Sequence, residues 1–218
     1  MQTPPTRTAP ATTPLNVWSR NPRIAALAEA LLFASLLWAT YRSVATASRQ
    51  VAFPGIANFG QVDDRLSRGA QPELTAFAAL KARGVNTVVR LNGGGAQIPI
   101  EQKQVESLGM RFVYLPWSSD ALPSHEQVVT FLALLHDPAT KAFVHCRAGA
   151  DRTGVMVALY RIEFDHWTTS QAITEMNQFH YYFIFLPHLQ RYVESFPATM
   201  NTDADLAKFQ PPLSAVPR

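Results

Sequence analysis

The sequence predicts an α/β fold: a single domain with a mostly parallel central sheet flanked by helices, preceded by an apolar N-terminal helix. Three observations support this class. Short β-prone runs alternate with amphipathic helical patterns, which is typical of a largely parallel sheet covered on both faces. One alternation, a strand, a tight loop and a helix, surrounds the single cysteine of the 218-residue chain. The composition of the N-terminal region and of the C-terminal tail also differs from that of residues 58–197, which leaves about 140 residues for one hydrophobic core.

Four elements follow one another in the first half of this domain. Residues 73–83 form an amphipathic helical pattern that ends at a glycine, and residues 86–91 form a buried strand pattern. A second helical pattern covers residues 99–108, again closed by a glycine, and a further strand pattern covers residues 111–115. This alternation predicts that both strands belong to the parallel part of the sheet.

Two capping boxes mark the beginnings of later helices. Ser124 is followed three residues later by Gln127, and Thr168 is followed in the same way by Gln171. An apolar face at helical spacing follows each box. These faces consist of Val128, Phe131, Leu132 and Leu135 in the first helix, and of Ile173, Met176 and Phe179 in the second.

The segment around Cys146 is a junction between a strand and a helix. Residues 141–145 are short, apolar and β-prone, whereas helical spacing of apolar residues begins after Arg152. That spacing is set by Val155, Ala158, Leu159 and Ile162. Cys146 therefore lies at the start of a loop that ends on a helix N-terminus.

The residue types in this loop suit attack on a bound phosphate. Free backbone N–H groups and the positive end of the helix dipole favour anions and the thiolate form of a cysteine. Gly149 and Gly154 allow a close backbone curl, and the planar fork of Arg152 matches two phosphate oxygens. Thr153 can donate its hydroxyl to the sulfur. The loop thus predicts a nucleophilic Cys146 in an anion cradle.

The run from His145 to Gly154 resembles the signature of cysteine-dependent protein tyrosine and dual-specificity phosphatases. Residues 59–72 resemble the entry segment of the compact bacterial and atypical dual-specificity members, in which a short hairpin leads to a Gly-x-Gln-Pro turn. The resemblance covers residues 58–197, which we expect to form the catalytic domain. It implies hydrolysis of phosphoric monoesters through a cysteinyl-phosphate, without a cofactor.

The resemblance also implies roles for the residues of the loop. Cys146 is the expected nucleophile, Arg152 the expected clamp on the phosphate, and His145 and Thr153 the expected supports of the cysteine. The expected phosphate-binding residues are Arg147, Ala148, Gly149, Ala150, Asp151 and Arg152.

The general acid has two candidates. In the resembled family it is an aspartate on the loop between a strand and the helix that precedes the cysteine strand, and Asp120 occupies that place. Asp151 is the alternative, because it lies inside the phosphate loop and some phosphoinositide phosphatases with a similar loop are thought to use an acid there. Arg90 and Arg147 are further candidates for lending positive potential to an anionic substrate.

Several other site classes receive no support. The histidines show no metal-ligand spacing with one another or with a second cysteine, so no metal is predicted. Phosphate-binding and dinucleotide-binding glycine motifs are absent from the sequence, and a net charge of +3 does not argue for nucleic acid. The chain departs from the family pattern at residues 93–95, where three glycines replace the charged residues that often follow this strand.

The N-terminal region has its own composition. Residues 1–22 are rich in Pro, Thr and Ala and predict disorder. Residues 24–41 are nearly all apolar and predict a transmembrane anchor over residues 23–45. A packed soluble helix and a cleaved signal peptide are the alternatives. The flanking arginines give a one-charge bias that places the catalytic domain outside the cytoplasm. Residues 46–57 are then a linker, and residues 198–218 a loose C-terminal tail.

We therefore expect a single-pass membrane phosphatase that acts on a phosphorylated protein. Within enzymes, the alternative substrate is a phosphoinositide or inositol phosphate. From other classes, the alternatives are a phosphate-binding pseudophosphatase and an enzyme that handles sulfur or arsenate through a similar cysteine loop.

Overall fold

The computed structural model describes residues 26–35, 49–118 and 120–209. By its internal contacts the chain divides into two units, Met1–Thr46 and Ala47–Arg218. Within the first unit, the described residues 26–35 are helical, and their large apolar side chains, such as Leu31, are exposed.

The predicted single-pass membrane anchor is wrong. The helix described in this region has ten residues, which span about 15 Å, half of the ~30 Å hydrocarbon core. Among the described residues, no helix combines the length and apolar character that crossing a membrane requires. The other parts of the predicted anchor, residues 23–25 and 36–45, lie outside the described residues, as do residues 1–22. The membrane localisation and the membrane partner inferred from this segment therefore fall away.

The second unit contains one six-stranded sheet with the order β1-β2-β3-β6-β4-β5. β3, β6, β4 and β5 are parallel neighbours, whereas β1 and β2 join one edge in antiparallel fashion. The predicted mostly parallel sheet is thus confirmed, and β6 lies between β3 and β4. The strands are β1 (Arg49–Gln50), β2 (Gly60–Gln61), β3 (Leu66–Gly69), β4 (Thr87–Asn92), β5 (Arg111–Trp117) and β6 (Ala142–His145).

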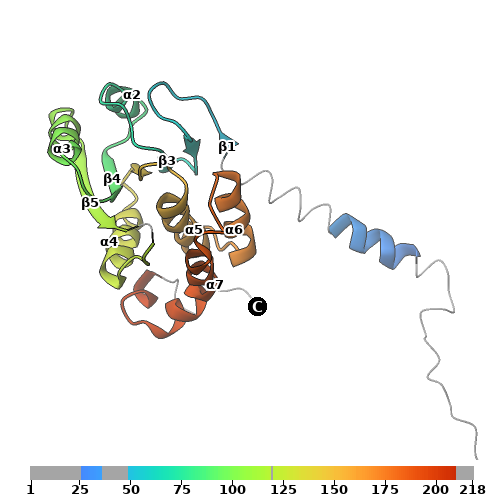
Figure 1. The fold of residues 1–218 in the computed structure, drawn as a ribbon. Coiled ribbons are helices and arrows are strands. Elements are labelled where there is room, and N and C mark those ends of the chain that lie inside the picture. Colours follow the sequence, from blue (N-terminus) through green and yellow to red (C-terminus); the bar gives the residue numbers. More distant parts are fainter. Residues whose placement is uncertain (1–25, 36–48, 119, 210–218) are drawn as a thin grey trace, which may run out of the picture. The chain divides into compact units, whose positions relative to one another are not determined.

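Helices cover both faces of the sheet, with α2 and α3 on one side and α4 to α7 on the other (Figure 1). The helices are α2 (Ala76–Ala82), α3 (Gln97–Ser107), α4 (His125–His136), α5 (Asp151–Phe164), α6 (Thr169–Gln178) and α7 (Pro187–Thr202), followed by the 3-10 turn η2 (Ala207–Phe209). α5 begins directly after the loop that follows β6, so the Cys146 loop has the predicted strand–loop–helix setting.

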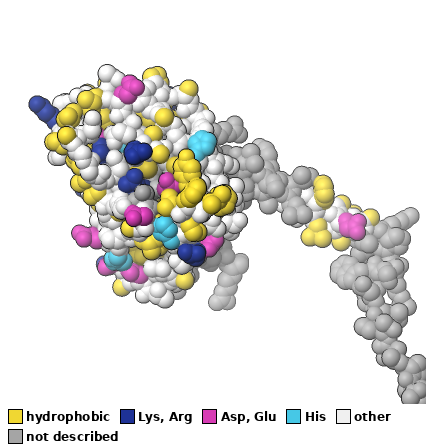
Figure 2. Space-filling view, viewed as in Figure 1, with side chains coloured by type: hydrophobic (Ala, Val, Ile, Leu, Met, Phe, Trp, Pro, Cys, Tyr) yellow, Lys and Arg dark blue, Asp and Glu magenta, His cyan; other side chains and the backbone are white. Residues whose placement is uncertain are grey.

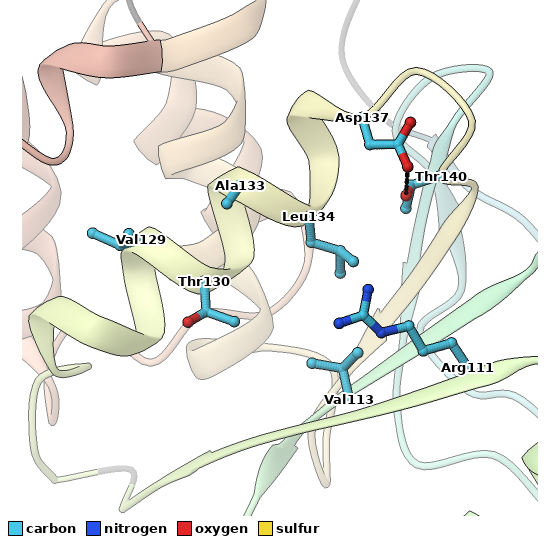
Figure 3. Close-up of a pocket in the computed structure, with 8 residues that line it drawn as sticks. All are labelled: Arg111, Val113, Val129, Thr130, Ala133, Leu134, Asp137 and Thr140. Atoms are coloured by element: carbon cyan, nitrogen blue, oxygen red, sulfur yellow. Dashed lines mark hydrogen bonds between the residues drawn. The ribbon is translucent and has the colours of Figure 1, made fainter.

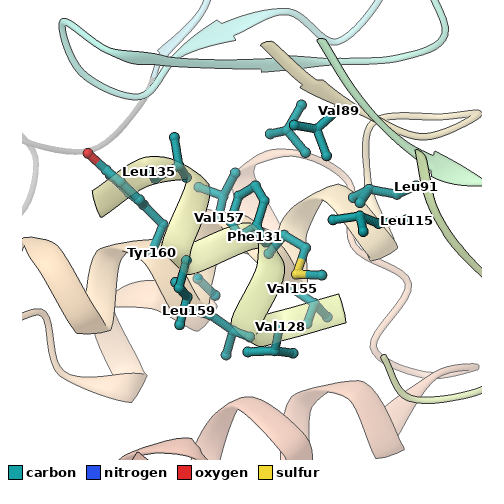
Figure 4. Close-up of a cluster of buried hydrophobic side chains, with 14 of the residues drawn as sticks. Val89, Leu91, Leu115, Val128, Phe131, Leu135, Val155, Val157, Leu159 and Tyr160 are labelled. Carbon is teal, nitrogen blue, oxygen red and sulfur yellow. The ribbon is translucent and has the colours of Figure 1, made fainter. Parts of the chain in front are cut away.

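Alternate residues of the central strands supply two separate cores. In β4, Val89 and Leu91 join Phe131 of α4 in the larger cluster (Figure 4). Val88, which directly precedes Val89 in the sequence, joins Phe77 of α2 on the opposite face. This alternation is what a strand buried on both faces requires, because successive side chains point to opposite sides.

Both predicted capping boxes are confirmed. Ser124 Oγ accepts a hydrogen bond from the Gln127 amide at 3.2 Å, and Gln127 Oε1 accepts one from the Ser124 amide at 2.7 Å. Thr168 and Gln171 form the same reciprocal pair at 3.3 and 2.9 Å. These bonds satisfy otherwise unpaired N–H groups and fix the beginnings of α4 and α6.

Two segments expected to lie outside the domain belong to its fold. In the expected linker, Phe53 and Ile56 are buried in the smaller core. In the expected C-terminal tail, α7 continues to residue 202, and Met200 and Leu206 are buried. The reason at this end is spacing, because Met200 lies four residues after Phe196 and extends the same apolar helix face. Residues 210–218 lie outside the described residues.

Candidate active site

Cys146 lies at the carboxyl end of the central strand β6 and is 2% exposed. The loop then turns through Gly149, whose φ is +67°, and enters α5 at Asp151. This left-handed conformation suits glycine, because a Cβ would strain it. The turn returns the chain above the sheet and places the N-terminus of α5 beside Cys146.

Neighbouring segments hold the carbonyl groups of this loop from behind. The Gln71 amide donates to Arg147 O at 3.3 Å, and Asn58 Nδ2 donates to Ala148 O at 3.2 Å and to Gly149 O at 3.1 Å. In a trans peptide the next N–H points away from the carbonyl, so these bonds turn the following amides toward the inside of the loop. Within the described ranges, the amides of residues 147–150 donate to no protein acceptor. The loop is therefore a cradle of free N–H donors.

The loop fits closely against the end of β3. A Cβ placed on Gly149 would lie 2.4 Å from the carbonyl carbon of Gly69 and 2.5 Å from the amide nitrogen of Ala70. These are backbone atoms, so they cannot turn aside as a side chain would. The Gly-x-Gln-Pro turn that begins at Gly69 thus supports the loop directly.

No sequence pattern points to Arg68, yet its side chain lies directly behind the loop and is fully buried. Its Nη2 donates to Gly149 O at 2.9 Å, and its guanidinium carbon lies 3.9 Å from the centre of the Phe179 ring. Burial lowers the pKa of Arg68 to about 10, although the negative charges of Glu175 and Cys146 act to raise it. Arg68 therefore stays protonated at neutral pH and places a positive charge near Cys146.

Glu101 of α3 is a second residue that sequence patterns do not reveal. Its buried carboxylate lies 2.7 Å from His145 Nε2, accepts from Gln71 Nε2 at 2.6 Å, and accepts from the guanidinium of Arg90. Burial acts to raise the pKa of Glu101, but the bonds from His145 and Gln71 and the charge of Arg90 outweigh it and lower the pKa. The ionised carboxylate thus fixes the His145 ring next to Cys146.

The two arginines that were expected to lend positive potential to a substrate, Arg90 and Arg147, lie in different environments. Arg90 is 2% exposed and paired with Glu101, so it belongs to the support of the loop and does not face a substrate. Arg147 is exposed on the loop itself.

Arg152 and Thr153 begin α5 on the far side of the loop. Arg152 Nη1 donates to Trp117 O at 2.9 Å, which holds the guanidinium at the carboxyl end of β5. Thr153 is fully buried, and its Oγ1 has no hydrogen-bond partner in the described part of the chain, Cys146 included. Its hydroxyl is thus unused beside the loop.

The two acid candidates occupy different settings. Asp120 is exposed on the loop after β5 and accepts from Ser118 Oγ. That bond, with a backbone hydrogen bond and the charge of His188, lowers the pKa of Asp120. Asp151 is half-buried, and its Oδ1 accepts from the Tyr182 amide at 3.0 Å. Asp151 therefore holds a neighbouring segment, whereas Asp120 stands in solvent beside the strand end that binds Arg152.

Unpartnered buried polar atoms gather around this loop. Such atoms are uncommon in folded proteins and mark places where function outweighs local stability. Among the described residues, they belong to ends of strands β3 to β6, to the turn after β3, and to the first turns of α5 and α7. The residues are Arg68, Gln71, Asn92, Trp117, His145, Thr153 and His188.

Two other features lie apart from these residues. A hollow of about 390 Å³ opens between β5 and α4, where Arg111, Leu134 and Asp137 line it together with smaller side chains (Figure 3). It offers no nucleophile.

His125 and Asp203 form an ion pair of 2.9 Å at the surface, beside Asp205. The potential metal-binding atoms of these three residues lie within 4.8 Å of one another. Neither feature includes a residue of the Cys146 loop.

The fold and the loop define a protein of the cysteine-dependent phosphatase class. The chain belongs to the family described as "DSP-PTPase phosphatase fused to NAD+ Kinase", whose model matches residues 50–182. The resemblance inferred from the sequence is thereby confirmed.

Known proteins of this class are similar to the chain. The dual specificity protein phosphatase TpbA of Pseudomonas aeruginosa is 30% identical over 131 residues, which are 59% of this chain and 57% of that protein. A tyrosine-protein phosphatase CDC14 homologue of Schizosaccharomyces pombe is 27% identical over 142 residues, 64% of this chain and 25% of that protein. The chain thus spans between a quarter and somewhat over half of these relatives.

Solved structures share the fold. The crystal structure of P. aeruginosa TpbA has a TM-score of 0.57 and 24% identity, over 76% of this chain and 94% of that chain. The core catalytic domain of the PP-IP phosphatase SIW14 from S. cerevisiae has a TM-score of 0.57 and 18% identity, over 71% and 98% of the respective chains.

We predict that Gly149→Ala destabilises the protein more than Gly94→Ala. Both glycines have positive φ, but a Cβ at Gly94 meets no atom within 4 Å, whereas one at Gly149 meets the backbone of Gly69. The first change should cost about 1 kcal/mol of unfolding free energy for backbone strain, and the second about 3 kcal/mol. Urea denaturation measures both, and equal losses would show that contact with Gly69 is unimportant.

We predict that Glu101→Gln lowers the unfolding free energy by about 3 kcal/mol at neutral pH, because it leaves the buried Arg90 without a charge partner. A lowered pKa in the folded state means that Glu101 contributes fully above its unfolded pKa of about 4.3 and loses the contribution as pH falls further. The difference from wild type should therefore shrink below about pH 4. Glu106→Gln, an exposed change on the same helix, is the control, and a pH-independent difference would contradict this account.

We predict that Arg68→Met slows alkylation of Cys146 by iodoacetamide about tenfold at about pH 6, because a nearby cation that favours the thiolate is lost. The single cysteine makes the rate unambiguous. Arg68→Lys should retain most of the rate. Arg83→Met is the matched control, since Arg83 stacks on Phe53 at 4.8 Å, away from the loop. Equal rates in Arg68→Met and wild type would remove Arg68 from the electrostatics of the cysteine.

Proposed function

We propose that the chain is a phosphoric monoester hydrolase of the protein tyrosine and dual-specificity type, whose catalytic domain comprises residues 58–197 and the flanking segments that pack into the same fold. The observation that carries this proposal is the loop after β6. Its carbonyls are bonded from outside, its amides are free, and the nucleophile lies at its first position. Free amides at a helix N-terminus bind a phosphate dianion without any further group.

The proposed reaction proceeds by two displacements. Cys146 Sγ attacks phosphorus, the P–O bond to the leaving group breaks, and a cysteinyl-phosphate forms. The amides of the loop and the fork of Arg152 bind the oxygens on which charge is spread. Water then attacks phosphorus, which releases inorganic phosphate and restores the thiolate. His145 orients the cysteine, and Thr153 supplies its unused hydroxyl to the sulfur as it leaves.

We propose Asp120 as the acid that protonates the leaving oxygen and later accepts a proton from water. Its support is accessibility, because Asp120 is exposed, whereas Asp151 already accepts from the Tyr182 amide. Asp120 is ionised in the free protein, since its pKa is lowered. A bound phosphate dianion acts in the opposite direction and favours the protonated form that catalysis requires.

The test is hydrolysis of an aryl phosphate and an alkyl phosphate by the full chain and its variants. Cys146→Ser should lose at least about 10³-fold in kcat/KM on both substrates. Asp120→Asn should lose about 10²-fold or more on the alkyl phosphate, whose leaving group needs a proton, and much less on an activated aryl phosphate.

Asp151→Asn is the matched comparison, because it changes the rival carboxylate in the same way. A loss confined to the alkyl phosphate in Asp151→Asn, with Asp120→Asn unaffected, would reverse the assignment of the acid. Turnover that persists in Cys146→Ser would refute the mechanism, and a wild-type protein that binds phosphate without turnover would be a pseudophosphatase.

A further inference from the structure

Four consecutive large apolar side chains stand in solvent between α6 and α7. Tyr182, Phe183, Ile184 and Phe185 are 57%, 54%, 71% and 77% exposed, and we call them the apolar rim. Figure 2 shows hydrophobic side chains gathered on this face of the molecule beside basic and acidic ones. A contiguous exposed apolar patch commonly marks a surface that binds another molecule.

The apolar rim is attached to the phosphate loop. The Tyr182 amide donates to Asp151 Oδ1 at 3.0 Å, and Asn58 Nδ2, which also binds two loop carbonyls, donates to Phe179 O at 3.1 Å. On the other side, the Tyr181 hydroxyl donates to Leu186 O and accepts from the Gln190 amide. These bonds hold the segment at the edge of the loop, so a phosphate bound there brings the rest of its molecule against the rim.

The segments around the loop also lack fixed positive charge. The stretches after β4 (residues 92–98), after β5 (residues 117–124) and between α6 and α7 (residues 179–187) contain no lysine or arginine. The loop itself supplies Arg147 and Arg152. A ligand with several phosphate groups needs cations beyond the loop, because the loop amides can hold only one phosphate and the others need charged partners of their own. A ligand with one phosphate and apolar surroundings needs only what this site offers.

We propose that the apolar rim is a specificity surface for phosphorylated proteins whose side chains next to the phosphorylated residue are bulky and apolar. This inference rests on the proposed phosphatase function and names its substrate class. Burial of such side chains against Ile184 and Phe185 removes apolar area from water on both partners, which stabilises the bound peptide without any new polar contact.

The experiment compares two phosphotyrosine peptides that differ only in the residues flanking the phosphotyrosine: leucine and phenylalanine in one, serine and glycine in the other. The wild-type chain should prefer the apolar peptide by about tenfold in kcat/KM. The double variant Ile184→Gln with Phe185→Gln should lose this preference, while its rate on a small aryl phosphate stays at the wild-type value. These two side chains are the most exposed of the rim, so their replacement disturbs the core least.

Ile100→Gln is the matched control. Ile100 is 48% exposed on α3, outside the rim, and its replacement should leave the preference intact. The aryl phosphate separates the two proposals, because absence of turnover there would refute the phosphatase function itself. Turnover of the aryl phosphate with equal rates on the two peptides would refute the rim alone.

Three other results would also overturn the inference. One is a higher kcat/KM on an inositol polyphosphate than on either peptide. Another is loss of binding to phosphoinositide vesicles in the double variant with an unchanged peptide preference, which would assign the rim to a lipid surface. The third is a fall in molecular mass by sedimentation in the double variant, which would assign the rim to a second copy of the chain.

Discussion

The orientation of three peptide groups between Cys146 and α5 is the constraint on which the rest of the site depends. A phosphate dianion needs N–H donors, so the carbonyls of the same peptides must be bonded elsewhere. Asn58, Arg68 and the Gln71 amide supply those bonds, from before β3, from β3 itself and from the turn after it. The edge hairpin of the sheet therefore supports the Cys146 loop and does more than extend the sheet.

The same logic explains the charges beneath the loop. His145 is fixed by a buried carboxylate from α3, and that carboxylate is in turn balanced by Arg90 of β4. A buried charge without a partner would be costly, so the network is stable only as a complete set. It links α3, on one face of the sheet, to β4 and to the residue that precedes Cys146 at the end of β6. The opposite face contributes Arg68, whose buried guanidinium keeps a positive charge close to the sulfur.

Local sequence patterns predicted most of the fold because they depend on neighbours in the chain. Apolar alternation, helical spacing and the two capping boxes are properties of short segments, and each was sufficient to place an element. The same locality misled at both ends of the chain. Apolar composition alone suggested a membrane anchor at residues 23–45, where the structure describes a helix too short for that role. At the C-terminal end, the Pro-rich composition suggested a loose tail from residue 198, although α7 and its buried apolar face continue to Met200.

The sequence by itself predicted the strand–loop–helix around Cys146, which the structure contains, and it proposed Cys146 and Arg152 as the nucleophile and the phosphate clamp. This was possible because the whole motif is local, with both residues inside the ten-residue run 145–154. Only the tertiary structure revealed the roles of Asn58, Arg68 and Glu101. Asn58 lies 91 positions from Gly149, and Glu101 lies 44 positions from His145, so no local pattern can connect them. Contacts between distant segments depend on the order of strands in the sheet, and that order arises only when the whole domain packs.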